Sequence, residues 1–462
     1  MNIASSAYSR RMTVAIVEHG PMGGTCLNRG CIPTKILTFP ADIITQIQNS
    51  EKLNIHADVK SVDFPALMQR MRHETQSDSK AQGESVDAAP NLDWYKGTGE
   101  FIADYTMRVD KDEFKAPLIF IVAGARPFIP PIKGINDVDY LTSKTVLDLN
   151  EQPESVIIIG GGYIACELGH FFSAVGTKVT ILGRNPYLVK AEDPDVSELL
   201  KKELSRRMTV LTNTAVEEVH KKGKSKIAVA LDRENGSKRE FEAETLLVAA
   251  GRIPNTDLLK PEKTGVKIDQ RGYVIVDEYF RTSKEGIWAF GDVIGKHMFR
   301  HVANDESEIT WYNVMQLKEG NEDRLTPFSY HAVPRAVFSY PQIATVGMTL
   351  KEASQTEKRL LVGQTDYTNT AKGLAMVDPV GFVRVIADVK TGQILGATVI
   401  GPYAPILIQE IVNLMYTRDR SYIPVLQAIH IHPALPEVVQ RAVGSLAPYG
   451  WEPKGHTHEH HH

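Results

Sequence analysis

The chain has 462 residues, which is too many for one hydrophobic core and predicts roughly three domains of ~150 residues each. Hydrophobic residues make up 42% and charged residues 23%, as in ordinary globular proteins, and no apolar run is long enough to span a membrane. The formal net charge of -4 argues against nucleic acid and anionic lipid as partners.

In chain order, β-rich runs, glycine turns and helical stretches alternate through the first two thirds. This pattern predicts an α/β fold with helices layered on parallel sheets. Residues 1–11 are expected to be the remainder of a helix, and Glu18 follows the first strand. The predicted strands are residues 14–17, 155–159, 178–182 and 246–249, with a long helix that ends near Gly176 between the second and the third.

The pattern of predicted secondary structure changes after about Arg324. Strand-like runs at residues 336–338, 382–387 and 394–400 precede a helical stretch at 406–416, which predicts a separate α+β module with an antiparallel sheet. The tail from residue 448 ends in GHTHEHHH and is expected to be disordered, consistent with part of an expression tag. Its histidines could also bind metal.

Cysteine is scarce, since the chain contains three in all: Cys26, Cys31 and Cys166. Three are too few for a secreted disulfide scaffold, and the N-terminus lacks the charged-then-apolar order of a signal peptide. We therefore predict a reducing, cytoplasmic location, where a cysteine pair is more often catalytic than structural. Cys166 is interpreted as a small buried hydrophobic residue.

The segment GGTCLNRGCIPTK, residues 23–35, carries the strongest signal. Residues five apart in a regular helix point about 140° away from each other, so a bridge between Cys26 and Cys31 needs an irregular segment, which Gly30 permits. Pro33 suits the first turn of a helix that starts near Cys31, where the helix dipole lowers a thiol's pKa. The alternative is a pair of buried structural cysteines.

A second motif follows the strand at residues 155–159. Gly160, Gly162 and Ala165 form a G-x-G-x-x-A turn between a strand and a helix, which is the context of a dinucleotide-binding fingerprint. An ordinary glycine-rich turn is the alternative. After the next strand, no carboxylate stands at the place where NAD-binding units have one, and Arg184 and Lys190 stand near it. NADPH is therefore predicted over NADH, unless the two cations are merely solvated loop charges.

The spacing between the glycine turn and the end of the following strand can also be applied to the N-terminal part of the chain. If Glu18 occupies the matching position at the end of its strand, it is placed to bind the adenosine ribose of FAD. The third glycine of the corresponding turn would then fall at position 0. We therefore expect that the first strand and its glycine loop are missing from the sequence.

These motifs, together with AAGRIPN (249–255), IWAFGD (287–292) and IHPALPE (431–437), resemble one enzyme group along nearly the whole chain. The group is the class I pyridine nucleotide-disulfide oxidoreductases, which contains dihydrolipoamide dehydrogenase and the glutathione, mercuric and mycothione reductases. The resemblance implies two Rossmann-like dinucleotide-binding domains and a C-terminal α+β dimerisation domain. The expected bounds are 1–150 for the FAD domain, 151–272 for the NAD(P) domain, 273–325 for a return to the FAD domain, 326–447 for dimerisation and 448–462 for the tail.

The resemblance also implies roles for single residues. Cys26 would be the thiol that attacks the substrate, and Cys31 would be the thiol against the flavin. Lys35 and Glu167 would pair beside the flavin N5, and Tyr163 would cover the nicotinamide pocket. Further residues expected on FAD are Glu18, Gly24, Thr25, Gly124, Gly291 and Asp292, and those expected on NADP are Gly160, Gly162, Ala165, Arg184, Lys190 and Gly251.

His432, oriented by Glu437, would be the acid/base supplied by the partner subunit, so the resemblance implies a homodimer. An imidazole can carry a proton near neutral pH, and a carboxylate can fix its tautomer. His430 is expected to be structural. The expected activity is electron transfer between NADPH and a small disulfide or dithiol, with IHPALPEVV most similar to the mycothione reductase branch. The alternatives are an NAD-dependent dihydrolipoamide dehydrogenase and a flavin-free redox sensor or binding protein.

Overall fold

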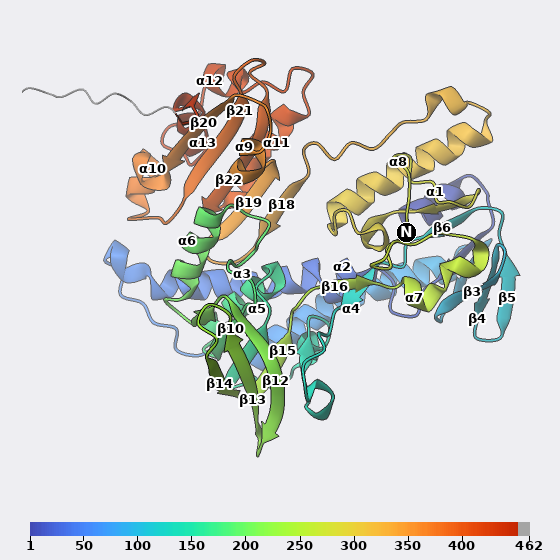
Figure 1. The fold of residues 1–462 in the computed structure, drawn as a ribbon, viewed down its shortest axis with the longest axis horizontal. Helices are drawn as coiled ribbons and strands as arrows, with labels where there is room; N and C mark the ends of the chain where they lie inside the picture. The colour runs from blue at the N-terminus through green and yellow to red at the C-terminus, as the bar shows by residue number, and fades with distance from the viewer. Residues whose placement is uncertain (451–462) are drawn as a thin grey trace, which may run out of the picture. The chain divides into compact units, whose positions relative to one another are not determined.

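The fold is described by a computed structural model over residues 1–450 (Figure 1). Contacts divide the chain into two compact units. The first unit contains Met1–Gln48, Asp58–Leu188 and Arg207–Tyr330. The second contains Asn49–Ala57, Val189–Arg206 and the chain from His331 onward.

A five-stranded parallel sheet forms the nucleotide-type part of the first unit, with strand order β11-β10-β9-β15-β8. The β-branched run of β9 is buried on both faces between its neighbours, as expected for a central parallel strand. Helix α5 connects β9 to β10 and ends one turn before the next strand. The bounds are β8 Leu141–Thr142, β9 Ser155–Ile159, α5 Tyr163–Ala174, β10 Lys178–Leu182, β11 Thr209–Leu211 and β15 Thr245–Val248.

The strands predicted at 155–159 and 178–182 are thus confirmed, and the strand predicted at 246–249 begins and ends one residue earlier. An antiparallel sheet of three strands lies between β11 and β15 in the sequence and was not predicted. Its strands are β12 Thr214–Lys222, β13 Ser225–Asp232 and β14 Lys238–Ala243.

The remainder of the first unit contains two parallel strand pairs, β1 with β2 and β6 with β17. The second pair joins residues far apart in sequence, so the chain returns to its N-terminal part after the nucleotide-type sheet. The helix and strand predicted at the N-terminus are confirmed. The strands are β1 Val14–Val17, β2 Leu92–Tyr95, β3 Gly99–Ala103, β4 Thr106–Val109, β5 Asp112–Lys115, β6 Ile119–Ile121, β7 Ala125–Pro127, β16 Arg252–Pro254 and β17 Ile287–Ala289.

Helices surround these strands: α1 Asn2–Ser9, α2 Gly24–Arg29, α3 Cys31–Gln48, α4 Phe64–Asp87, α7 Thr256–Leu259 and α8 Arg300–Lys318. Helix α4 starts where the Asp63 carboxylate accepts a hydrogen bond from the Ala66 amide at 2.9 Å, a favourable N-cap. Helix α3 contains Pro40 in its interior, and this proline leaves the carbonyl of Ile36 without its intrahelical donor. The Arg70 guanidinium donates to that carbonyl at 3.4 Å.

The second unit is built on a six-stranded antiparallel sheet, in the order β18-β19-β22-β21-β20-β23, which confirms the predicted α+β module. Its core is formed by the buried side chains of β19, β21 and β22 with those of α11 and α13. The bounds are α6 Pro194–Leu204, β18 Pro334–Val337, β19 Gln342–Gly347, α9 Leu350–Ser354, β20 Leu360–Asp366, α10 Ala371–Ala375, β21 Phe382–Asp388, β22 Ile394–Gly401, α11 Ala404–Met415, α12 Ile423–Gln427, α13 Pro436–Gly444 and β23 Ala447–Pro448.

The start of the predicted tail needs a correction. Pro448 lies in β23, which pairs with β20, and the Tyr449 amide donates to the carbonyl of Leu360 at 2.9 Å. This backbone pairing orders Pro448 and Tyr449, where the sequence showed no hydrophobic pattern. The rest of the predicted tail, residues 451–462, lies outside the described residues.

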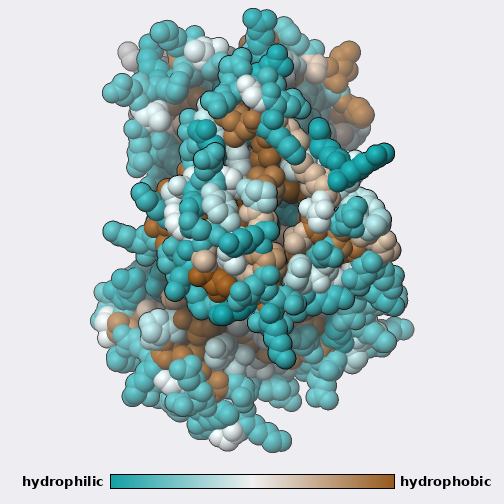
Figure 2. Space-filling view, turned by 90° about the vertical axis from the view of Figure 1, so that its right-hand side faces the viewer, coloured by the Kyte–Doolittle hydropathy of each residue, from teal (hydrophilic) through white to brown (hydrophobic). Residues whose placement is uncertain are grey.

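Hydrophilic side chains dominate the surface shown in Figure 2, and hydrophobic residues are scattered among them in small patches, as on most folded proteins. Within residues 1–450, no helix combines the length and apolarity that a bilayer crossing requires.

Candidate active site

The two cysteines lie on either side of a break between two helices. Cys26 is in α2, Cys31 is the first residue of α3, and Gly30 interrupts the helical path between them. A side chain at Gly30 would have its Cβ 3.0 Å from the carbonyl oxygen of Thr25, so glycine allows the close turn. This is the irregular segment that the five-residue spacing requires. Both thiols are reduced in the structure, with Cys31 exposed and Cys26 partly buried.

A single amide side chain holds the loop in front of α2. The Asn28 amide nitrogen donates to the carbonyl oxygens of Pro21, Met22 and Gly24, at 3.2, 2.8 and 3.1 Å. Gly24 and Thr25, both predicted on FAD, are the first two residues of α2. Asn28 was not predicted, although it lies within the cysteine motif.

The two thiols differ in acidity because they share a hydrogen bond. The bond from Cys26, aided by the nearby charge of Lys35, lowers the pKa of Cys31 to about 6. Donating that bond, together with burial, raises the pKa of Cys26. The position of Cys31 at the N-terminus of α3 favours a thiolate in the same direction. The shared hydrogen bond, Lys35 and the helix start therefore all favour a negative charge on Cys31 over one on Cys26.

One helical turn after Cys31, Lys35 pairs with Glu167 of α5, with 2.7 Å between Nζ and Oε2. The Glu167 side chain is only 5% exposed and that of Lys35 is 34% exposed, so the carboxylate is shielded from water and the lysine is partly shielded. The structure thus brings together Cys26, Cys31, Lys35 and Glu167, as the resemblance implies.

A second, buried network joins the same two helices further along. His170 is fully buried and lies 2.8 Å through Nε2 from Asp42 Oδ1 of α3, and 3.0 Å through Nδ1 from the Arg207 guanidinium. Arg207 also donates to Thr45 Oγ1 at 3.2 Å. Burial lowers the pKa of His170, and Arg207 can only donate, so a neutral ring that donates from Nε2 to Asp42 satisfies every contact. Nothing in the sequence indicated this network, because its members lie far apart in the chain.

The glycine turn after β9 has the geometry of a nucleotide-binding turn. Gly160 has φ +140°, and a Cβ there would lie 2.2 Å from the carbonyl oxygen of Ala249. Gly162 precedes α5, and no atom lies within 4 Å of the position its Cβ would take, so the backbone is open to a ligand. Ala165 is fully buried where α5 packs, and Tyr163 is 39% exposed at the start of the helix. Cys166 is fully buried, and burial raises its pKa to about 12.

The predicted nucleotide cations lie in different units. Arg184 is exposed in the loop after β10, whereas Lys190 is exposed in the segment Val189–Arg206 of the second unit. That segment is held there by Arg384, which pairs with Asp193 at 3.2 Å and also with Asp195.

The residues predicted on FAD away from the cysteines occupy two places. The Glu18 carboxylate follows β1 and accepts a hydrogen bond from the Gly20 amide at 2.8 Å. Gly124 and Gly251, the latter predicted on NADP, lie at opposite ends of the antiparallel pair of β7 and β16, where the Asn255 amide donates to the Gly124 carbonyl at 3.1 Å and the Phe128 amide donates to the Gly251 carbonyl at 2.9 Å.

Asp292 lies in the turn Gly291–Ile294, 3.8 Å from the Arg252 guanidinium, and burial raises its pKa. Beneath this turn, the Gly291 amide donates to Glu306 at 2.7 Å, and the Tyr330 hydroxyl donates to the other oxygen of Glu306 at 2.6 Å. Glu306 is fully buried, and burial raises its pKa as well. Neither Arg252 nor Glu306 was predicted; Arg252 could have been found, because it lies inside the AAGRIPN motif.

In the second unit, His432 and Glu437 are hydrogen-bonded, with 2.9 Å between Nδ1 and Oε1. Glu437 also accepts from the Ala434 amide at 3.1 Å, and the bond to His432 holds its pKa below the usual range. The His432 side chain is 68% exposed, with Nε2 not engaged by Glu437. His430, by contrast, is only 7% exposed and is held by Glu410 and the carbonyl of Ala428, which suits a structural residue.

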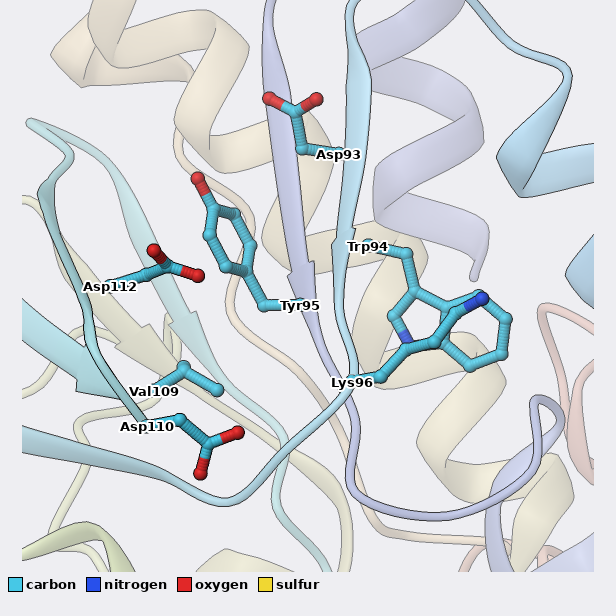
Figure 3. A pocket seen from close by; sticks show the side chains of 7 residues that line it. All are labelled: Asp93, Trp94, Tyr95, Lys96, Val109, Asp110 and Asp112. Carbon is cyan, nitrogen blue, oxygen red and sulfur yellow. The ribbon is translucent and has the colours of Figure 1, made fainter.

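A cavity of about 420 Å³ lies between β2 and the β4–β5 hairpin, and two of its lining residues, Trp94 and Tyr95, are hydrogen-bonded to the backbone of Glu18. Figure 3 shows the side chains around it, with the carboxylates of Asp93, Asp110 and Asp112 on different sides. None of the predicted site residues lines this cavity.

Comparison with known proteins agrees with this geometry. Residues 1–307 match the pyridine nucleotide-disulphide oxidoreductase family, and residues 333–443 match its dimerisation domain. Mycothione reductase from Mycobacterium tuberculosis is 36% identical over 438 residues, which cover 94% of each chain. Dihydrolipoyl dehydrogenase from Chlamydia pneumoniae is 30% identical over 441 residues, covering 94% of this chain and 92% of the relative.

Among solved structures, the Cu(II) complex of the HOCl-induced flavoprotein disulfide reductase RclA from Escherichia coli is similar, with a TM-score of 0.84 and 27% identity over 96% of both chains. The chain therefore belongs to the pyridine nucleotide-disulphide oxidoreductase family, the flavoprotein disulfide reductases that use FAD and NAD(P)H.

Proposed function

We propose that this chain is an NADPH-dependent reductase of a small disulfide of the mycothione or glutathione type, working through Cys26 and Cys31. The observation that carries the proposal is the hydrogen-bonded thiol pair across the α2–α3 break, beside the Lys35–Glu167 pair. In the overall reaction, NADPH, a proton and the substrate disulfide give NADP⁺ and two thiols. The cytoplasm is the proposed location, because a chain with three cysteines and a cycling pair suits a reducing compartment.

The residues present fit FAD at the flavin end and at the ribose. A thiolate at Cys31, a shielded Lys35–Glu167 pair and the Asp292 carboxylate are suited to surround a flavin, and the Glu18 carboxylate can accept a ribose hydroxyl. Residues 1–13 contain no glycine, so a turn like that at Gly160 is not available there for the diphosphate. Bound at these residues, FAD would supply the chemistry that accepts a hydride from NADPH and makes the electron pair available to the Cys26–Cys31 disulfide.

The thiol acidities suggest how the reduced pair works. Cys31 holds the negative charge, and Cys26 is a poor acid, so Cys26 needs a base before it can attack. We assign that base to His432, oriented by Glu437. Cys26 attacks one substrate sulfur and His432 protonates the thiol that leaves. The Cys31 thiolate then attacks Cys26, which releases the second thiol and restores the disulfide.

We further propose that the enzyme is a homodimer in which His432 serves the cysteine pair of the partner subunit. The apolar side chains near this histidine are unusually exposed for their size: Ile406, Leu426, Ile429 and Ile431 are 69%, 44%, 101% and 78% exposed. Exposed apolar residues in one region are typical of an interface. Their position in the part of the chain that matches the dimerisation domain supports the same assignment.

Cys26→Ser tests the thiol chemistry. The variant should lose reduction of mycothiol-type and glutathione disulfides while NADPH still bleaches the flavin, because only the attacking sulfur is gone. Cys166→Ala is the control and should keep turnover, since Cys166 is fully buried. Retained disulfide turnover in Cys26→Ser would contradict the proposal.

A panel of lipoamide, glutathione disulfide and mycothiol disulfide, each with NADPH and NADH, tests substrate and nucleotide. A dihydrolipoyl dehydrogenase-like enzyme would instead prefer lipoamide with the NAD couple. The cation at Arg184, in the place of a carboxylate, favours the NADPH assignment.

A further inference from the structure

The loop after β10, where Arg184 lies, is fixed by the backbone of a neighbouring turn. The Gly183 carbonyl accepts from the Thr214 amide at 2.9 Å, and the Asn213 amide donates to the Asn185 carbonyl at 2.9 Å. These two bonds lie on either side of Arg184. The arginine therefore extends from a backbone whose position is set on both sides.

A second arginine from a distant part of the sequence reaches the same loop. The Arg233 amide donates to the Asn213 carbonyl at 2.8 Å, and one nitrogen of its guanidinium donates to the Arg184 carbonyl at 3.2 Å. Arg233 follows β13, and its side chain is exposed. The guanidinium is thus held beside Arg184 through main-chain contacts alone.

The charges around these two arginines are not balanced by carboxylates. Among residues 1–450, no carboxylate lies within ion-pair distance of either guanidinium, although the acidic neighbours of Arg233 are close in sequence. Asp232 accepts bonds from the Glu234 and Asn235 amides, and Glu234 binds the side-chain amide of Asn213. A guanidinium carries five N–H donors, and Arg233 uses one of them on Arg184. Donors remain on both arginines for an anion.

We infer that Arg233 is a specificity-determining residue for the 2′-phosphate of NADPH, which it binds together with Arg184. The inference rests on the proposed use of NADPH. A phosphate dianion accepts charge-assisted hydrogen bonds from two guanidinium groups, whereas the 2′-hydroxyl of NADH offers no charge to either. Because both groups are exposed, we expect about tenfold in affinity from Arg233 rather than the larger effect of a buried pair.

Full-length enzyme carrying Arg233→Gln, Arg184→Gln or Lys224→Gln tests the inference. Lys224 is exposed at the opposite end of the β12–β13 hairpin, so its variant makes the same change of charge away from the loop. The probes are 2′,5′-ADP and 5′-AMP as competitive inhibitors, with KM and kcat for NADPH and NADH. Arg233→Gln should weaken inhibition by 2′,5′-ADP about tenfold and raise the KM for NADPH by the same factor. Inhibition by 5′-AMP, the KM for NADH and kcat should each stay within about twofold of wild type. Lys224→Gln should change none of them.

Three results would overturn the assignment of Arg233. In the first, Arg184→Gln weakens inhibition by 2′,5′-ADP but Arg233→Gln does not. In the second, Arg233→Gln weakens 5′-AMP as much as 2′,5′-ADP, which would indicate a structural role. The third result uses Arg233→Lys, which keeps the positive charge and is available if Arg233→Gln fails to fold. In that result, Arg233→Lys binds 2′,5′-ADP no better than a variant without the charge. If wild-type enzyme binds 2′,5′-ADP no better than 5′-AMP, the preference for NADPH itself is wrong.

Discussion

The acidity of Cys31 can be measured directly, because the three thiols of the chain are expected to titrate far apart. With a pKa of about 6, Cys31 is roughly 90% thiolate at pH 7, whereas an ordinary cysteine with a pKa near 8.5 is only about 3% thiolate. Burial and the bond to Cys31 raise the pKa of Cys26, and burial raises that of Cys166 to about 12. In protein freed of FAD, which would otherwise lie against Cys31, this one exposed thiol should therefore react with iodoacetamide at neutral pH.

The perturbation is Cys26→Ala, which removes the donor that contributes most to the low pKa of Cys31. Lys35→Met removes the positive charge that contributes in the same direction, and Lys115→Met, on exposed strand β5, is the matched control. The alkylation rate of Cys31 is followed against pH in the reduced protein by mass spectrometry. In wild type the rate should fall as the pH drops through about 6, since the thiolate is the reacting form.

Cys26→Ala should shift this midpoint upward by more than one pH unit and slow alkylation at pH 7 severalfold. Lys35→Met should shift it upward by less, because charge is the smaller of the two causes, and Lys115→Met should leave it in place. A wild-type midpoint near pH 8.5, or a midpoint unmoved by Cys26→Ala, would refute the reasoning that the neighbouring thiol sets the acidity of Cys31.

Three further changes test other parts of the site. Asp42→Ala should destabilise the fold by about 1–3 kcal/mol in denaturant titrations, since it leaves the Nε2–H of the buried His170 without its acceptor. In wild type, stability should be lost as the pH falls below about 6.5, because burial lowers the pKa of His170 and the unfolded state then takes up the proton. Tyr330→Phe should cost about 1–3 kcal/mol in thermal melts, because one oxygen of the buried Glu306 loses its donor. Gly160→Ala should abolish nucleotide binding in fluorescence titrations and lower the melting temperature, because its Cβ would lie 2.2 Å from a carbonyl oxygen at a left-handed φ.

The sequence was informative where chemistry and backbone geometry depend on residues close together in the chain. The break at Gly30 and the helix start at Cys31 follow from a spacing of five residues and a glycine, and the structure confirms both. The G-x-G-x-x-A turn likewise predicted β9, α5 and β10 to within two residues, because strand, turn and helix are local features.

Partners that meet only in three dimensions could not be predicted. Glu306 lies 15 residues from Gly291 in an α-helix whose sequence shows no special pattern, and Arg233 lies 49 residues from Arg184. The segment Val189–Arg206 appeared to continue the nucleotide-binding part, yet it belongs to the second unit. Ion pairs of Arg384 and Arg335 with its carboxylates hold it there, and those arginines follow more than 140 residues later.

Helix α3 is held against α5 at two places, one close to the cysteine pair and one far from it. At 100° per residue, Cys31, Lys35, Asp42 and Thr45 lie within about 80° of each other around the helix axis, so they share the face toward α5. Pro40 interrupts the hydrogen-bond ladder between Lys35 and Asp42, which would let the two halves of α3 rotate separately. The Lys35–Glu167 pair fixes the first half against α5, and the Asp42–His170–Arg207 network fixes the second. Because Cys31 is one turn from Lys35 and about 16 Å from Asp42 along a helix with this break, the first contact positions the thiol and the second holds the rest of α3 against α5.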